Sequence, residues 1–457
     1  MIKNEIVELE ILDLASDGNG VGRVDGQAVF VPFTLPGDRI RARIAKLQKN
    51  FAFGILTELI EPGAGRIKPD CPAFGRCGGC ALRQISYEGE LAAKTKFVQD
   101  AFDRIGGFSV SAAPCLASPS ADRYRNKVQY PLATSPDGRV FAGFYAPRSH
   151  RVIACSDCLL QPKLLNEIAD FLCGLFTEYG ISTYDETSGK GLLRHLYLRH
   201  AEKSGAVMAC IVINGTKLPR EEEIARRLQE ASPAVCTLLL NFNTENTNVI
   251  LGPRQKVLFG NGLLEDTLCG VPVALSPFSF YQVNTAGAEQ LYGVAKQFAE
   301  PKPEDLLLDL YCGAGTIGLS MSDAVGRLIG VEIVPAAVES AKKAAAQMGV
   351  NADFFCADAG AAAAKLAAEG LQPSLIVLDP PRKGCDRKTI DAVLQMSPAR
   401  VVMVSCNAAT AARDARLLAQ GGYQLRRLQP VDLFPRTRHV EAVLLLTRNE
   451  QSDFTVK

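Results

Sequence analysis

Apolar and polar residues alternate along the first 60 residues in short runs, EIVELEILDLA, GQAVFVP, DRIRARIAKLQ and FAFGILTELI. Turn-forming sequences such as DGNGVGR, VDGQ and LPGD separate these runs. Alternation with a period of two is typical of strands with one buried face, and short strands divided by tight turns favour a sandwich or a barrel. The pattern therefore predicts a small all-β barrel over residues 1–60.

The pattern changes after a boundary rich in proline and glycine, EPGAGRIKPDCP. In YEGELAAKTKFVQDAFDRIGGF, apolar side chains recur at helical spacing until Gly106 and Gly107 end the helix. From about residue 120 to 265, strand-like and helix-like runs mix without regular alternation, which indicates an α+β domain. We expect this central domain to cover residues 66–265, although its helix over about 88–107 could pack on the domain that follows.

The last third of the chain has continuous apolar runs, LLLDL (306–310), RLIGV (327–331), SLIVLD (374–379) and RVVMVS (400–405), with helical stretches such as PAAVESAKKAAAQM between them. Continuous apolar strands that alternate with helices are typical of a parallel sheet covered on both faces. YQLRRLQPVDLF and HVEAVLLLT are expected to add an antiparallel pair at one edge. The pattern predicts a Rossmann-like α/β domain over residues 266–457, in a multidomain chain.

Composition indicates where the protein is located and, from that, what role its cysteines have. Of 457 residues, 47% are hydrophobic and 22% are charged, as in an ordinary globular protein. No apolar run approaches the roughly 20 residues that span a bilayer, and MIKNEIVELEILDL lacks the features of a signal or transit peptide. We therefore expect a cytoplasmic protein without a membrane span. Because thiols stay reduced there, a tight group among the 14 cysteines indicates a metal or catalytic site.

The net charge of +1 provides no global attraction to nucleic acid, so any polyanion site must be local. RIRARIAKLQKN (39–50) is one candidate, because Arg39, Arg41 and Arg43 alternate with apolar residues. On a strand, this spacing places the three guanidinium groups on one face. The alternative is a solvated edge strand that uses charge to avoid aggregation.

A glycine-rich turn follows the first apolar strand of the C-terminal domain. LLLDLYCGAGTIGLS places Gly313, Gly315 and Gly318 after a strand and at the opening of a helix, where a ligand can approach the backbone closely. Glu332 ends the next strand, where a carboxylate can accept hydrogen bonds from ribose hydroxyls. The turn by itself also fits a nicotinamide dehydrogenase or a purely structural connection.

Four reactive side chains are predicted at the ends of neighbouring strands. Asp379, in LDPPRKG, lies at the carboxyl end of a buried strand before two prolines that make the turn rigid. Cys406, in VSCN, ends the next strand, and RTRHVEAV brings His439 and Glu441 to the start of the last one. We expect these groups to surround the crevice formed by the glycine-rich turn.

Taken in order, these motifs resemble the RNA uracil-5-methyltransferase family, which uses S-adenosylmethionine. The matching stretches are YRNKVQYP, FSFYQVN, LDLYCGAGTIGL, VEIVPAAV, LDPPRKG, VSCN and FPRTRHVE. GNGVGRVDGQAVFVPFTLPGD resembles the TRAM domain, a small OB-like barrel that binds RNA. The resemblance covers nearly the whole chain.

The resemblance implies a role for each reactive group. Carbon 5 of uracil is too weak a nucleophile to accept a methyl group unaided, and a thiolate that adds at carbon 6 activates it. Cys406 matches that nucleophile, Glu441 matches the base that removes the carbon 5 proton, and Asp379 would bond near the uracil edge or position the thiol. The matching cofactor contacts are Gln282, Tyr311, Gly313, Gly315, Thr316, Glu332, Asp358 and Asp379.

The resemblance also gives a reading of CPAFGRCGGC. In the ribosomal-RNA members, a four-iron, four-sulfur cluster is held by cysteines with this spacing and by one distant cysteine, which here matches Cys71, Cys77, Cys80 and Cys158. Cys155 is the rival for the fourth position. The spacing alone would equally allow a zinc site.

The combination of a TRAM-like segment with this cysteine set favours 23S ribosomal RNA as the substrate of a monomeric enzyme. A transfer-RNA enzyme of the same chemistry is the alternative. A radical methylthiotransferase with a TRAM domain is a remote one, since it needs Cys-x3-Cys-x2-Cys rather than the x5 and x2 spacing found here. The predicted RNA contacts are Arg39, Arg41, Arg43, Arg125 and Lys127.

Overall fold

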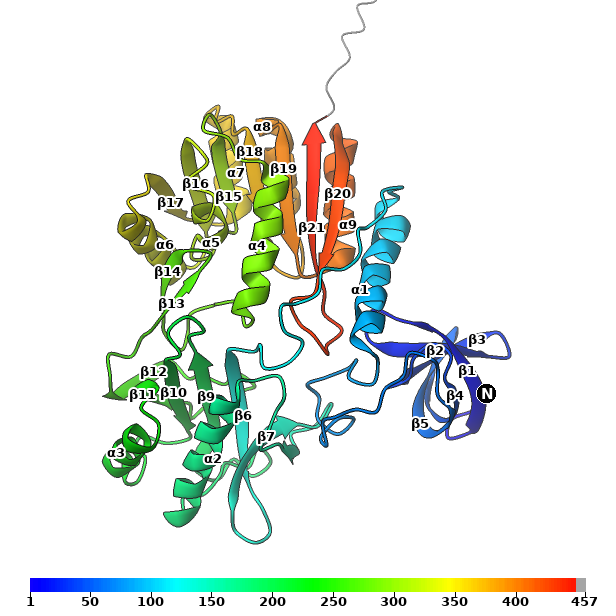
Figure 1. The fold of residues 1–457 in the computed structure, drawn as a ribbon, viewed down its shortest axis with the longest axis vertical. Helices are drawn as coiled ribbons and strands as arrows, with labels where there is room; N and C mark the ends of the chain where they lie inside the picture. The colour runs from blue at the N-terminus through cyan, green and yellow to red at the C-terminus, as the bar shows by residue number, and fades with distance from the viewer. Residues whose placement is uncertain (449–457) are drawn as a thin grey trace, which may run out of the picture. The chain divides into compact units, whose positions relative to one another are not determined.

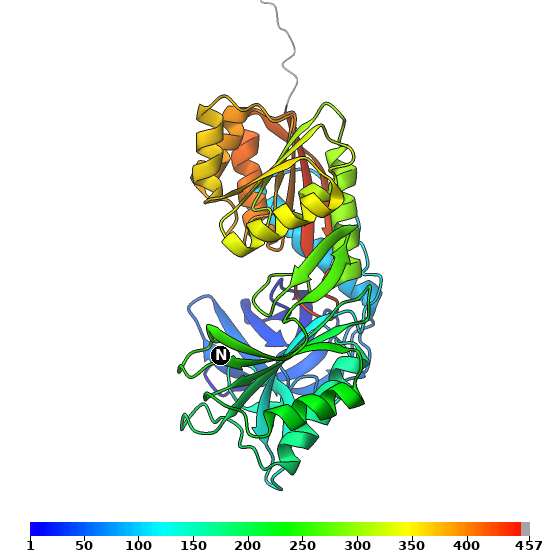
Figure 2. The same ribbon diagram turned by 90° about the vertical axis from the view of Figure 1, so that its left-hand side faces the viewer.

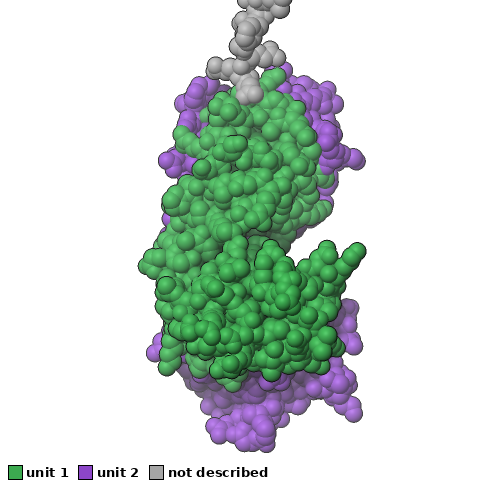
Figure 3. All heavy atoms as spheres, turned by 90° about the vertical axis from the view of Figure 1, so that its right-hand side faces the viewer, with its two compact units in different colours: residues 1–121, 380–386, 399–457 green, residues 122–379, 387–398 purple. Residues whose placement is uncertain are grey.

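A computed structural model describes residues 1–448, and residues 449–457, the end of the predicted C-terminal domain, lie outside the described part. The chain forms two compact units (Figure 3). Unit 1 comprises Met1–Ala121, Pro380–Asp386 and the residues from Ala399 onward, and unit 2 comprises Asp122–Asp379 and Arg387–Pro398. Each unit is thus assembled from segments that are distant in the sequence.

Unit 1 begins with a closed barrel in the strand order β1-β2-β3-β5-β4, which confirms the predicted barrel (Figure 1). Its strands are β1 (Ile6–Leu14), β2 (Asn19–Val24), β3 (Gln27–Pro32), β4 (Arg39–Leu47) and β5 (Phe51–Glu61). The alternating apolar side chains, among them Ile11 and Ile40, fill the interior. Strand β2 was predicted as a turn because of its glycines. Gly22 lies so close to β1 that a Cβ there would be 2.5 Å from the Glu10 carbonyl oxygen.

The rest of unit 1 combines helices with three hydrogen-bonded strands. Helix α1 (Tyr87–Ala101) continues into a π-helical turn (Phe102–Gly106), which ends at Gly107 with φ 71°. Strands β19 (Arg400–Ser405), β21 (Glu441–Arg448) and β20 (Tyr423–Val431) are hydrogen-bonded in that order and run antiparallel, so the predicted antiparallel pair is confirmed. Helix α9 (Ala408–Gln420) contacts α1 and the π-helical turn.

Unit 2 contains a seven-stranded sheet in the order β12-β11-β10-β9-β6-β7-β8. Its strands are β6 (Lys127–Thr134), β7 (Val140–Tyr145), β8 (Val152–Ala154), β9 (Leu193–His200), β10 (Val207–Ile213), β11 (Val235–Phe242) and β12 (Arg254–Phe259). Helices α2 (Lys163–Glu178) and α3 (Glu221–Ala231) cover one face of this sheet (Figures 1 and 2). Their apolar sides form one core with alternate residues of the sheet, such as Val128 and Leu198.

Unit 2 also contains parallel strands in the order β17-β16-β15-β18. The strands are β15 (Leu306–Leu310), β16 (Arg327–Glu332), β17 (Ala352–Cys356) and β18 (Leu375–Leu378), with helices α4 (Thr285–Ala299), α5 (Thr316–Leu319), α6 (Pro335–Met348), α7 (Ala359–Ala368) and α8 (Arg387–Met396). A hairpin, β13 (Leu264–Leu268) and β14 (Val271–Leu275), precedes α4. The parallel strands predicted from continuous apolar runs are confirmed. Within residues 1–448, no helix combines the length and the apolar character needed to cross a membrane.

Candidate active site

In the glycine-rich turn after β15, the absence of side chains leaves the backbone accessible to a ligand. Gly313 and Gly315 have φ values of 56° and 76°, in the left-handed region that side chains disfavour. A Cβ on Gly315 would lie 3.0 Å from the Phe354 ring, whereas the same position on Gly313 faces open space. Glu332, at the end of β16, fixes this turn, since its carboxylate accepts hydrogen bonds from Gly313 N (3.1 Å) and Val334 N (2.9 Å). Gly313 thus presents an unobstructed backbone beside a carboxylate.

Tyr311 enters this turn in a strained conformation. Its φ of 64° is left-handed although it is not a glycine, which costs roughly 1–2 kcal/mol. Its hydroxyl lies 2.9 Å from Thr389 Oγ1 on α8, where Thr389 is fully buried. Strain held in place by packing is concentrated at ligand sites, and Tyr311 is one of the residues predicted to contact the cofactor.

Two carboxyl groups with raised pKa values, Asp309 and Asp379, lie beside the turn. Asp309, on β15, is fully buried, and its Oδ2 accepts a hydrogen bond from Gly318 N at 3.0 Å. Its Oδ1 has no hydrogen-bond partner among the described residues. Burial, followed by the negative charges of Asp379 and Glu332, raises the pKa of Asp309 to about 8. Burial also raises the pKa of Asp379, directly after β18, to about 7.

Asp309→Asn should change how stability depends on pH. A carboxyl whose pKa is about 8 in the folded protein and about 3.9 in the unfolded chain favours folding below pH 3.9. This contribution is lost as pH rises through 8. In the absence of cofactor, we expect wild type to melt several degrees lower at pH 9 than at pH 6, and the variant to lose much of that difference. Equal pH dependence in wild type and variant would show that Asp309 is ionised in the folded protein.

Cys406 and Glu441 lie at the same end of two paired strands of unit 1. Cys406 directly follows β19, and Glu441 is the first residue of β21. These antiparallel strands pair Ser405 with Ala442. Cys406 follows Ser405 and Glu441 precedes Ala442, so the same register extended by one residue brings Cys406 opposite Glu441. Glu441 is 5% exposed, and Cys406 is half-buried. The structure therefore brings together two of the three residues predicted to be catalytic.

The VSCN and LDPPRKG motifs also meet. Asn407 caps α9 through its side-chain oxygen, which accepts a hydrogen bond from Ala409 N at 3.1 Å. Its amide nitrogen donates to the Arg382 carbonyl oxygen at 3.0 Å, and Thr410 Oγ1 donates to the same oxygen at 3.3 Å. The residue after Cys406 thus joins the turn that follows Asp379 in the chain.

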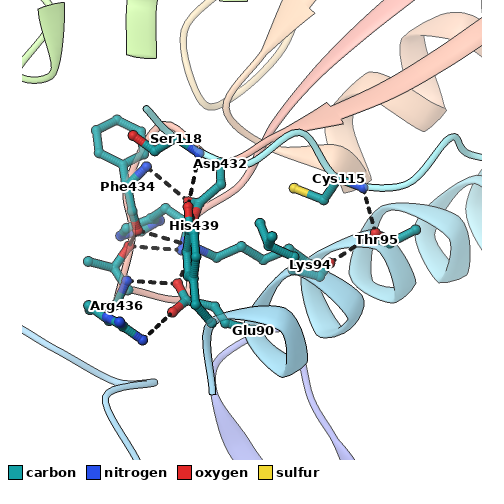
Figure 4. Close-up of polar contacts among 12 residues, drawn as sticks. Glu90, Lys94, Thr95, Cys115, Ser118, Asp432, Phe434, Arg436 and His439 are labelled. Carbon is teal, nitrogen blue, oxygen red and sulfur yellow. Dashed lines mark hydrogen bonds and ion pairs between the residues drawn. The ribbon is translucent and has the colours of Figure 1, made fainter. Parts of the chain in front are cut away.

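A buried charge network holds the segment between β20 and β21 that leads to Glu441 (Figure 4). Lys94, on α1, donates hydrogen bonds to Glu90 Oε1 (2.7 Å), Asp432 Oδ1 (2.6 Å) and the Phe434 carbonyl oxygen (3.1 Å). Glu90, Lys94 and Asp432 are all 0% exposed. Charged groups are buried this completely when they are paired. We refer to Glu90, Lys94 and Asp432 as the buried triad.

The same segment is fixed at Arg436, which has φ 67° although it is not a glycine. Arg436 N donates to Glu90 Oε1 at 2.7 Å, and its carbonyl oxygen accepts hydrogen bonds from Ala81 N (3.0 Å) and Leu82 N (3.1 Å). His439 lies further along, with its ring centroid 6.0 Å from that of Phe434. Residues 432–439 are therefore tied to α1 and to the segment that directly follows Cys80.

The buried triad was not predicted from the sequence. A pattern in the sequence could have indicated it: Glu90 and Lys94 are four residues apart, and the same helical spacing continues to the apolar residues Val98 and Ala101. A charged pair in line with the buried face of a helix indicates a buried ion pair rather than a solvated face. FSFYQVN also contains a residue that the prediction passed over, Phe280, which is 78% exposed beside the predicted cofactor residue Gln282.

Comparison with known proteins identifies the family. Residues 3–57 match the TRAM domain, 307–370 a methyltransferase domain and 363–449 the tRNA (uracil-5-)-methyltransferase family. A protein of Halalkalibacterium halodurans described as an uncharacterized RNA methyltransferase is 41% identical over 446 residues, 97% of each chain. The chain belongs to the RNA uracil-5-methyltransferase family.

Other family members extend the match. A protein of Listeria monocytogenes, also described as an uncharacterized RNA methyltransferase, is 40% identical over 453 residues, 98% of each chain. The crystal structure of Pyrococcus abyssi tRNA (uracil-54, C5)-methyltransferase in complex with S-adenosyl-L-homocysteine has a TM-score of 0.77 at 25% identity, and the match covers 96% of this chain and 99% of that one. The predicted family and the methyltransferase fold are thereby confirmed. The dehydrogenase and methylthiotransferase alternatives are wrong.

Other predicted cofactor residues have local partners in the structure. Gln282 Nε2 donates to the Tyr292 hydroxyl at 3.2 Å. Asp358 is exposed and caps α7, since its Oδ1 accepts a hydrogen bond from Ala361 N at 3.0 Å. Thr316 is the first residue of α5. Asp358 therefore has a structural role as a helix cap, beside the cofactor role predicted for it.

The predicted cluster cysteines are divided between the two units. Cys71, Cys77 and Cys80 belong to unit 1 and Cys158 to unit 2, and all four are half-buried. Within residues 1–448, no three His, Cys, Asp or Glu side chains are arranged to hold a metal ion. Two local features nevertheless suit thiolate ligands: Gly79 N donates to Cys77 Sγ at 3.3 Å, and hydrogen bonds from Cys155 and from the Leu160 and Gln161 amides lower the pKa of Cys158 to about 7.

The arginines predicted to bind RNA on the barrel are largely balanced by acids. Arg39 lies 2.9 Å from Glu8 and 3.0 Å from Glu61, and Arg41 lies 2.7 Å from Glu58. Arg43 Nη1 donates to Asn4 Oδ1 at 3.3 Å. Arg125 and Lys127 lie in unit 2, just before β6 and at its first residue, and both are half-buried. The alternating arginines therefore carry much less free charge than their spacing suggests.

Proposed function

We propose that this protein transfers a methyl group from S-adenosylmethionine to carbon 5 of a uridine in RNA. Cys406 is the nucleophile, and Glu441 is the base. The observation that carries this proposal is the pairing of β19 with β21, which sets Cys406 opposite Glu441 at one end of the strands. A thiol and a carboxylate at the same end of two paired strands are the two groups that this reaction requires of the protein.

The residues divide the reaction between them. The Cys406 thiolate adds to carbon 6 of uracil, and the electron pair moves through the ring so that carbon 5 becomes nucleophilic. S-adenosylmethionine, when bound, supplies the methyl group, which carbon 5 takes from its sulfonium sulfur. Glu441 then removes the proton from carbon 5, and the electrons of that bond re-form the double bond and expel the thiolate.

Two further groups serve binding in this proposal. Asp379 has a raised pKa of about 7, so near neutral pH part of it is protonated and can donate a hydrogen bond to a uracil carbonyl oxygen. The open backbone at Gly313, with Glu332 beside it, suits the cofactor: the turn admits close approach, and the carboxylate accepts from ribose hydroxyls. Gln282, Tyr311, Gly315, Thr316 and Asp358 remain proposed contacts of the same cofactor.

We propose 23S ribosomal RNA as the substrate, because the TRAM domain occurs together with the cysteine set. Transfer RNA is the second candidate, favoured by the similarity to the Pyrococcus abyssi enzyme, which acts on uracil 54 of tRNA. The test is to incubate the purified protein with labelled S-adenosylmethionine and unmodified 23S RNA or tRNA, and then to map 5-methyluridine. Label in 23S RNA alone supports the proposal, label in tRNA alone selects the second candidate, and label in neither contradicts both.

We also propose that Cys71, Cys77, Cys80 and Cys158 hold a four-iron, four-sulfur cluster, on the basis of their spacing and the lowered pKa of Cys158. No step of the methyl transfer needs the cluster. Protein purified without air should be brown and contain about four irons. Cys77→Ser should lose both properties, and Cys236→Ser, at an exposed cysteine outside the set, should keep them. A colourless anaerobic preparation with one zinc would overturn this assignment.

A further inference from the structure

Arg199, on β9, is a buried cation with unused hydrogen-bonding capacity. It is 1% exposed, and its Nη2 donates to the Ser279 carbonyl oxygen at 2.8 Å. Its Nε and Nη1 make no well-formed hydrogen bond to a described residue. The Tyr197 hydroxyl interacts with the guanidinium more weakly and opposes the lowering of the Arg199 pKa that burial causes. Buried guanidinium groups are normally paired with acids or fully hydrogen-bonded, because an unpaired buried charge is costly. Nε and Nη1 together carry three N–H groups, and a single neutral hydroxyl cannot balance a buried guanidinium charge, so an anionic partner is missing.

Two more cations lie beside Arg199. Lys127, on β6, is its direct partner across the antiparallel pair of β6 and β9, so the two side chains share one face of the sheet. Arg125 lies two residues before Lys127, and its Nε donates to the Lys127 carbonyl oxygen at 3.2 Å. Burial, together with the positive charges of Arg199 and Arg125, lowers the pKa of Lys127 to about 8. No acidic side chain within residues 1–448 forms an ion pair with any of the three. We refer to these residues as the cation cluster.

We propose that the cation cluster of Arg125, Lys127 and Arg199 binds a phosphate group of the RNA backbone. The proposal rests on the proposed function and names part of the surface that holds the substrate. A phosphodiester supplies two anionic oxygens, which a guanidinium can bind through a pair of parallel N–H groups. It would satisfy the free donors of Arg199 and balance three like charges at once.

The surroundings favour RNA over a free phosphate ion. Ser279, whose carbonyl oxygen holds Arg199, lies between Phe278 and Phe280, which are 51% and 78% exposed. Aromatic side chains beside a basic site are typical of surfaces that bind single-stranded nucleic acid. A small ion would gain nothing from these rings.

The alternative is that Arg199 has a purely structural role. Its guanidinium carbon lies 5.6 Å from the centroid of the Tyr197 ring, and its bond to Ser279 could by itself hold the loop. The two readings differ in what neutral substitutions do to RNA binding. A structural arginine affects folding, whereas a phosphate ligand affects the salt dependence of binding.

The experiment measures RNA affinity against salt concentration for wild type, Arg199→Gln and Lys127→Met. Each variant should bind RNA about tenfold more weakly, and the slope of log affinity against log salt should fall by about one. Arg226→Gln is the matched control, because Arg226 lies in the same unit on α3, is exposed and pairs with Glu230. The control should keep both affinity and slope. Lys127→Met, at a half-buried position, carries the test if Arg199→Gln does not fold.

Further measurements distinguish an error in the cation cluster from an error in the proposed function. Wild-type affinity and slope in a folded Arg199→Gln and in Lys127→Met would overturn the cation cluster while leaving the methyltransferase assignment intact. A second outcome is that both variants lose RNA affinity, while wild type binds S-adenosylhomocysteine but methylates no RNA. That outcome would support the cation cluster and refute the proposed function. Inorganic phosphate at matched ionic strength should not displace RNA, and strong competition by it would overturn the assignment to the RNA backbone.

Discussion

Glu441→Gln should methylate its RNA substrate once and then remain covalently bonded to it. The variant keeps the thiol of Cys406 and the glycine-rich turn, so addition at carbon 6 and transfer of the methyl group can still occur. It lacks the base that removes the carbon 5 proton, and without that removal the thiolate cannot be expelled. On a denaturing gel, the protein should migrate as a conjugate with methylated RNA, formed in the presence of S-adenosylmethionine, with turnover reduced by at least about 10²-fold.

Cys406→Ala is the contrasting variant. It cannot form the bond to carbon 6, so it should be inactive and bind RNA only reversibly, with no conjugate on the gel. Cys356→Ala, at an exposed cysteine on β17, controls for the loss of a thiol elsewhere and should turn over like wild type. The two catalytic substitutions therefore fail at different steps, although the residues are neighbours across β19 and β21.

The behaviour of the two variants shows which part of the proposed mechanism is wrong, if either part is. If Glu441→Gln turned over at the wild-type rate, the base would lie elsewhere, and His439 would be the next residue to test. If Cys406→Ala still methylated RNA, covalent catalysis would be wrong for this protein. A conjugate formed by Cys406→Ala would assign the nucleophile to another cysteine.

Much of the fold was predictable because its strands bury their faces in simple ways. The alternating residues of β1, β3, β4 and β5 predicted a barrel, and the continuous apolar runs of β15 and β16 predicted parallel strands. The exceptions have local causes. Strand β2 contains glycines because its neighbours lie too close for a side chain. Strand β17 has the sequence ADFFC, in which only Phe354 is buried. Neither strand shows the alternation that a prediction depends on.

The candidate site was predictable only in part, because it depends on contacts between distant segments. That Cys406 follows one strand and Glu441 begins another could be predicted, whereas the register between these two strands is a tertiary property. Arg39 was predicted to be free for RNA because its partner Glu8 lies on another strand. The partner of Lys94 could not be predicted, since Asp432, which it binds, lies more than 300 residues away in the sequence.

Lys94→Met should destabilise unit 1 more than any surface substitution. The side chain of Lys94 is completely buried between Glu90 and Asp432, so methionine would leave Asp432 without its cation and Glu90 with only the longer ion pair to Arg436, at 3.6 Å. Removing one partner of a buried ion pair costs about 3–5 kcal/mol. Lys96→Met is the matched control on the same helix, because Lys96 is exposed and its ion pairs with Asp13 and Asp100 are at the surface. Surface pairs contribute about 1 kcal/mol or less, so denaturant unfolding should separate the two variants clearly.

The pH dependence of this loss tests its electrostatic origin. Burial already raises the pKa of Glu90 in the presence of Lys94, and removal of the cation should raise it further. A carboxyl whose pKa is raised in the folded protein stabilises it at low pH and loses that contribution as pH rises through the folded pKa. The deficit of Lys94→Met relative to wild type should therefore be largest at pH 7 and above, and should shrink toward pH 5. Adding Glu90→Gln and Asp432→Asn to Lys94→Met should recover part of the stability at neutral pH. If Lys94→Met were as stable as Lys96→Met at pH 7, the buried triad would not be what holds residues 432–439 in place.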